Sequence, residues 1–150
     1  ANGLLGVGDE IQEHLGELAG IAEHGRHIGL AREVHGDVAG AQGYLLDIMN
    51  KLLFTGDNNN SLVWLFLDGC APLSKYLVTL EKQKERMAEF DTIFPGHGPQ
   101  MSSDFILDQI SCVKSILDGT CEAKDYKSFA GDAKICTYGR ASVAFNPENL

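Results

Sequence analysis

The sequence lacks several features that would place it directly in a broad functional class. No apolar run approaches the ~20 residues that a membrane-spanning helix needs, so we expect no membrane partner. Basic residues are few: 12 Lys and Arg against 21 Asp and Glu give a net charge of −9, which argues against nucleic-acid binding. None of the four cysteines forms a C-x-x-C pair, which excludes zinc-finger spacing.

What the chain does contain is typical of one globular domain. It has 150 residues, of which 44% are hydrophobic and 22% charged, so a single domain over residues 1–150 can bury a core without disulfides. We therefore expect the cysteines to be mostly reduced thiols and the protein to be cytoplasmic. The first residues, ANGL, do not resemble a retained signal peptide.

Hydrophobic patterns predict alternating helices and strands, hence an α/β or α+β fold. The run LVWLFL is a buried strand or a buried helical turn, and it would form a subunit interface if it is not internal, which leaves a homo-oligomer open. Loops at strand ends would carry any site. The predicted helices span residues 9–19, 72–87 and 103–119; a hairpin spans 43–55, a strand 92–94, and two short strands lie within 134–145.

Three short stretches contain residues suited to chemistry. In the third, EFDTIFPGHGP, two glycines and two prolines surround His97 directly after a strand, which favours a histidine held at a set angle to meet a ligand. In the second, LFTGD, Asp57 follows another strand. The first is EHGRHIG, residues 23–29. Imidazole and carboxylate groups together suit zinc, and also iron or manganese.

The order FTGD, helix, FDTIFPGHG over residues 51–99 resembles the metallo-β-lactamase-fold hydrolases. The resemblance implies an αββα sandwich, shortened or incomplete in its first half. It also implies that Asp57 bridges two metal ions as the catalytic carboxylate, and that His97 binds one of them.

The same resemblance extends to the N-terminal H-x-H-x-D-H signature of that family, whose nearest counterpart here is AEHGRHIG. It assigns metal ligation to His24 and His27, and Asp37 stands where the family has a further histidine, with His35 nearby. Two departures matter: Ala22 replaces a histidine, and Arg26 replaces an aspartate, placing a cation where the family has an anion. Arg26 is then a candidate for binding a substrate carboxylate or phosphate, as is Arg140.

Two functions from different classes follow. The first is a metal-dependent hydrolase in which a metal-bound hydroxide attacks the ester, thioester or lactam carbonyl of a small-molecule substrate, with one or two zinc ions, or iron or manganese. Its core ligand set would be His27, Asp57 and His97, three protein ligands plus water. The alternative is a catalytically degenerate domain of the same fold that acts as a binding or scaffold module, as Ala22 and Arg26 suggest.

Overall fold

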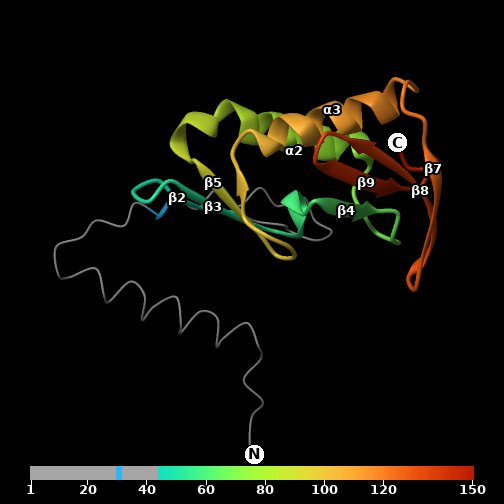
Figure 1. Ribbon diagram of the computed structural model, residues 1–150, viewed down its shortest axis with the longest axis horizontal. Coiled ribbons are helices and arrows are strands. Elements are labelled where there is room, and N and C mark those ends of the chain that lie inside the picture. The colour runs from blue at the N-terminus through green and yellow to red at the C-terminus, as the bar shows by residue number, and fades with distance from the viewer. Residues whose placement is uncertain (1–29, 32–43) are drawn as a thin grey trace, which may run out of the picture.

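The computed structural model describes residues 30–31 and 44–150, which form two helices, two 3₁₀ turns and nine strands (Figure 1). The elements in chain order are β1 (Leu30–Ala31), β2 (Leu45–Asp47), β3 (Leu52–Gly56), η2 (Asp57–Asn59), β4 (Leu62–Leu65), α2 (Leu73–Glu85), η3 (Met87–Glu89), β5 (Thr92–Pro95), β6 (Met101–Ser102), α3 (Phe105–Leu117), β7 (Lys124–Ser128), β8 (Gly131–Tyr138) and β9 (Ala141–Phe145).

The strands form two mixed sheets. One has the order β1-β2-β3-β5-β6 and the other β4-β9-β8-β7. Each contains one parallel pair, β3 with β5 and β4 with β9, while the other neighbours are antiparallel. A parallel pair requires a long crossover, and the chain from β3 to β5 makes it through η2, β4 and α2. This crossover brings the carboxyl ends of β3 and β5 to one edge of the sheet.

Both helices lie on the same side of the strands, and the core lies between them and the sheets (Figure 1). Apolar residues at spacings of three and four give each helix one buried stripe. Leu73, Tyr76 and Leu80 are buried on α2, and Ile106, Ile110 and Val113 on α3. The strands add the fully buried side chains of Leu46, Leu53, Ile93 and Val143.

Most predicted elements within the described residues are confirmed, including the helices over 72–87 and 103–119 as α2 and α3, while the helix predicted over residues 9–19 lies outside them. The 43–55 hairpin is β2 with β3, the strand before the His97 collar is β5, and the tail strands are β8 and β9. LVWLFL contains the strand β4, in which Val63 and Leu65 are buried, so these two belong to the core and not to a subunit interface. The sequence analysis missed β6, which has only two residues, and β7, whose sequence KDYKS is largely polar.

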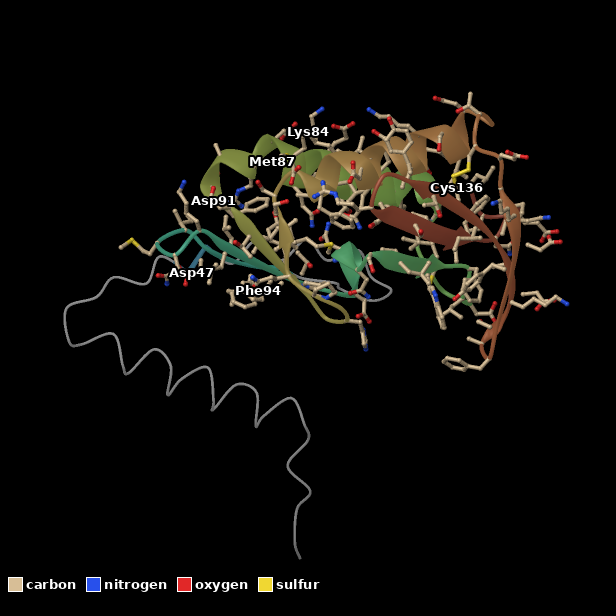
Figure 2. All side chains as sticks on the ribbon, viewed as in Figure 1. Asp47, Lys84, Met87, Asp91, Phe94 and Cys136 are labelled. Atoms are coloured by element: carbon tan, nitrogen blue, oxygen red, sulfur yellow. A yellow bond between two sulfur atoms is a disulfide. The ribbon has the colours of Figure 1, made fainter. Side chains whose placement is uncertain are left out.

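The prediction that the cysteines are mostly reduced is wrong for two of the four. Cys121 and Cys136 form a disulfide, which lies beside the C-terminal end of α3 (Figure 2), while Cys70 and Cys112 are free. Disulfides are rare in cytosolic proteins, so the cysteines no longer support a cytoplasmic location, which stays a prediction.

Both α2 and α3 have 13 residues, and no described helix has the length and apolar character to cross a membrane.

The described residues therefore have a mixed α and β fold, in agreement with the predicted class. The finer prediction of an αββα sandwich concerns the whole chain. It depends also on the N-terminal residues outside the described ranges, and it is taken up below as part of the proposed function.

Candidate functional site

Asp57 and His97 follow the two parallel strands β3 and β5, whose residues pair Leu53 with Ile93 and Gly56 with Pro95. Because the strands run in the same direction, the residues that follow them emerge at the same sheet edge. The Gly96 N–H donates a hydrogen bond of 2.7 Å to the Gly56 carbonyl, which extends the contact between the two chains beyond the strands. The topology thus places the predicted carboxylate and imidazole next to each other.

The two side chains are in direct contact. His97 Nδ1 lies 2.7 Å from Asp57 Oδ1. Asn60 fixes both residues: its Oδ1 accepts a hydrogen bond of 3.0 Å from the His97 backbone N–H, and its Nδ2 donates one of 3.3 Å to Asp57 Oδ1. The side chains of His97 and Asp57 are 80% and 58% exposed, so a solute can reach them.

The electrostatics keep Asp57 in the form that binds cations. The hydrogen bond with His97 lowers the pKa of the Asp57 carboxyl, and the hydrogen bond from Asn60 lowers this pKa further, against a smaller opposing effect of burial. Asp57 is therefore anionic at neutral pH, as a metal ligand must be.

Position 96 needs a glycine because Asp57 and the Gly56 backbone lie close to its Cα, and not because of its backbone conformation. A Cβ atom at this position would lie 2.8 Å from Asp57 Oδ1, so the carboxylate would have to move, and 3.1 Å from the Gly56 carbonyl carbon, which is a tight contact. Gly98, by contrast, has a φ of +99° with open space around it, so its glycine is needed for the turn. The glycine collar predicted from the sequence therefore has two separate functions around His97.

Two buried polar atoms beside Asp57 have no hydrogen-bond partner in the described part of the chain. They are Thr55 Oγ1 and Asn58 Nδ2, on residues that are 1% and 7% exposed. Native structures satisfy most buried polar groups, so each exception requires an explanation. Both unpaired atoms fall within one residue of the Gly56-Asp57 pair.

The pair of side chains suits a metal ion. Ligands at 2.0–2.2 Å from a tetrahedral ion lie about 3.4 Å apart, so an ion shared by His97 Nδ1 and Asp57 Oδ1 would have to displace the proton of their hydrogen bond and separate the two atoms by about 0.7 Å. Both side chains are exposed enough to do so. Among residues 30–31 and 44–150, no three His, Cys, Asp or Glu side chains gather at one point.

The other predicted site residues have different outcomes. The proposed ligands His24, His27 and Asp37 and the proposed substrate contact Arg26 lie outside the described residues. Arg140 lies within them and is engaged: its Nε donates to Asp108 Oδ2 at 2.6 Å, and an ion pair of 3.2 Å joins it to Asp104. The guanidinium already has two carboxylate partners, which argues against the role of Arg140 as a substrate ligand.

Asn60 is the site residue that the sequence analysis missed. Its spacing from Asp57, three residues on in a turn, is a common one for side-chain hydrogen bonds and was the available signal. No protein-family model matches this chain, and a comparison with curated proteins gave no match. The argument for a function therefore depends on the residues at this sheet edge.

Proposed function

We propose that the protein is a metal-dependent hydrolase of the metallo-β-lactamase type, acting on the ester, thioester or lactam carbonyl of a small molecule. The observation that supports this most is the contact of Asp57 with His97, 40 residues apart in sequence, at the carboxyl ends of parallel strands. The αββα sandwich and membership of that family belong to the same proposal, since the FTGD and PGHG stretches suggest the fold, the family and the hydrolase function together.

The proposed ion is zinc, with iron or manganese as substitutes that the same donors accept. Asp57 supplies an anionic oxygen and His97 an imidazole nitrogen, while His27 would complete three protein ligands, and His24 and Asp37 would serve a second ion. A bound ion of this kind lowers the pKa of water and polarises a carbonyl, the chemistry that hydrolysis needs.

The chain's own residues orient this chemistry. The Asn60 side chain accepts from the His97 backbone N–H through Oδ1 and donates to the Asp57 carboxylate through Nδ2. The two proposed metal ligands therefore stay on one side of the turn. The exposure of both side chains leaves room for a substrate to approach from solvent. Gly96 keeps the space beside Asp57 Oδ1 free of a side chain.

Metal analysis tests the proposal. The protein, purified without added metal and then dialysed against zinc, should retain about one ion or more per chain, and Asp57→Asn and His97→Gln should each lower the zinc content. Asp91→Asn is a matched control, because this exposed carboxylate precedes β5 at its opposite end. Near-zero zinc, iron and manganese, with no uptake on dialysis, would overturn the proposal.

The alternative of a degenerate scaffold module is supported by Ala22 and Arg26 in the sequence. It predicts a folded protein that takes up no metal and hydrolyses none of a panel of ester, thioester and lactam substrates. The same metal analysis therefore separates the two functions.

A further inference from the structure

The turn that carries Asp57 is held from inside the protein by polar side chains of both helices. The Tyr76 hydroxyl of α2 donates a hydrogen bond of 2.5 Å to the Asn58 carbonyl. The two hydrogens of Gln109 Nε2 on α3 are shared among three acceptors, the carbonyls of Asn58 and Asn60, both at 3.4 Å, and the Tyr76 hydroxyl at 3.1 Å. Two helices thus hold the backbone on both sides of Asn59.

Asn59 is held by its side chain. Its amide pairs reciprocally with that of Gln83 on α2, with distances of 3.0 and 3.1 Å, and its Nδ2 also donates to Gln109 Oε1 at 2.6 Å. Asn59, Gln83 and Gln109 are each no more than 1% exposed. We call these three amides, together with Tyr76, the amide cluster.

The amide cluster is not needed merely to fill the core. Buried amides cost free energy unless they are hydrogen-bonded, and apolar side chains of similar volume would pack between helices and sheet without that cost. What a satisfied buried network adds is a single fixed arrangement of the groups that it joins. Here the joined groups are two helices and the turn of residues 57–60.

The two ends of that turn are the site. Asp57 is its first residue, and Asn60, its last, accepts the hydrogen bond from the His97 N–H and donates to the Asp57 carboxylate. Gln109 donates to the Asn60 backbone carbonyl, so a shift of that backbone would move the two candidate metal ligands, Asp57 and His97. Fixing the turn from inside also fixes the relative positions of Asp57 and His97.

We propose that the amide cluster positions Asp57 and His97 for metal binding, with Gln109 as its central positioning residue. This inference rests on the proposed function, since it concerns the same site. It assigns a role to residues on α2 and α3 that do not touch the ion or the substrate and act through Asn58, Asn59 and Asn60.

The test compares three variants of the whole 150-residue chain. Gln109→Met keeps the size of the side chain and removes its hydrogen bonds. Tyr76→Phe is milder and removes one hydroxyl, so it serves if Gln109→Met does not fold. Val113→Ala is the control, because Val113 is fully buried on the same helix, one turn further on, and its loss disturbs packing alone.

Two readouts are followed for each folded variant, well below its unfolding temperature. The first is Co²⁺ affinity from visible absorption, which Gln109→Met should weaken by about tenfold, as loss of supporting hydrogen bonds does at metal sites. The second needs no metal: the His97 backbone N–H, observed by NMR, should exchange faster in Gln109→Met and Tyr76→Phe than in Val113→Ala.

The outcomes separate the two proposals. If the unmodified protein binds no Co²⁺, the proposed function fails, and the exchange of the His97 N–H still tests the positioning role. If it binds Co²⁺ and Gln109→Met weakens binding no more than Val113→Ala at equal loss of stability, the positioning role fails while the proposed function stands. Selective loss of affinity in Gln109→Met and Tyr76→Phe supports both.

Discussion

Replacing Gly96 by alanine should disable the site while leaving the fold intact. The new Cβ would lie 2.8 Å from Asp57 Oδ1, whereas ordinary non-bonded contacts begin at about 3.4 Å, so the carboxylate has to move by about 0.6 Å. That oxygen is bound to His97 Nδ1 at 2.7 Å and to Asn60 Nδ2 at 3.3 Å, and a shift of this size breaks or weakens both bonds.

The expected cost in stability is small, and the expected cost to the site is larger. Overpacking a well-packed position costs about 1–3 kcal/mol, and because Asp57 is 58% exposed and can swing outward, we expect about 1 kcal/mol. The displaced ligand should weaken Zn²⁺ or Co²⁺ binding by about tenfold or more, which is about 1.4 kcal/mol or more. Urea unfolding measures the first quantity, and competition titration with a chelator the second.

Gly98→Ala is the matched control within the same collar. It meets no atom within 4 Å, but its φ of +99° strains any other residue by about 1–2 kcal/mol. The two variants should thus lose similar stability, and only Gly96→Ala should lose metal affinity beyond that. Equal affinity in the two variants would refute the assignment of Gly96 to the space beside Asp57.

Two further predictions concern the support of the fold. The Cys121–Cys136 disulfide closes 15 residues, so its reduction should lower the free energy of unfolding by about 3 kcal/mol; thiol titration of the denatured protein should find two thiols before reduction, and four would contradict the disulfide. Lys114 Nζ, 2.7 Å from Glu81, lowers the pKa of the Glu81 carboxyl. A lowered carboxyl pKa stabilises the fold at pH 7 and ceases to do so as acid protonates the group, so Glu81→Gln should cost less than about 1 kcal/mol at pH 7 and almost nothing near pH 3; equal costs at both pH values would count against this ion pair.

The sequence predicts the elements whose patterns are local. Apolar spacing gives α2 and α3, and runs around Asn50 and Gly139 give the two hairpins, because each pattern lies within about 20 residues of chain. The strand β7 has no such pattern. It is an edge strand, and all of its five residues except Tyr126 are charged or polar. A polar edge strand lacks the alternating apolar residues that predict a strand, so a prediction from hydrophobic periodicity alone assigns it to a loop.

The site is predicted in part for the same reason. Asp57 and His97 each follow an apolar strand, and the helix between the strands indicates a parallel pair, which is enough to bring them together. Their supports could not be found so easily, because Asn59 is 24 residues from Gln83 and 50 from Gln109. One signal was present: Gln83 follows Leu80 at helical spacing, so a polar residue occupies a position on the buried stripe.

The distribution of buried polar groups shows why this sheet edge is exceptional in the described part of the chain. The buried polar side chains of the described residues are Thr55, Asn58, Asn59, Gln83 and Gln109. The first three lie on either side of Asp57, and the last two donate to or accept from that same stretch. A core built only for stability has no reason to concentrate this cost at one strand end, since each buried polar group needs partners and two atoms here have none among the described residues. Proteins break such packing rules mainly at functional sites, and this supports the proposal that the buried polar groups here position Asp57 and His97.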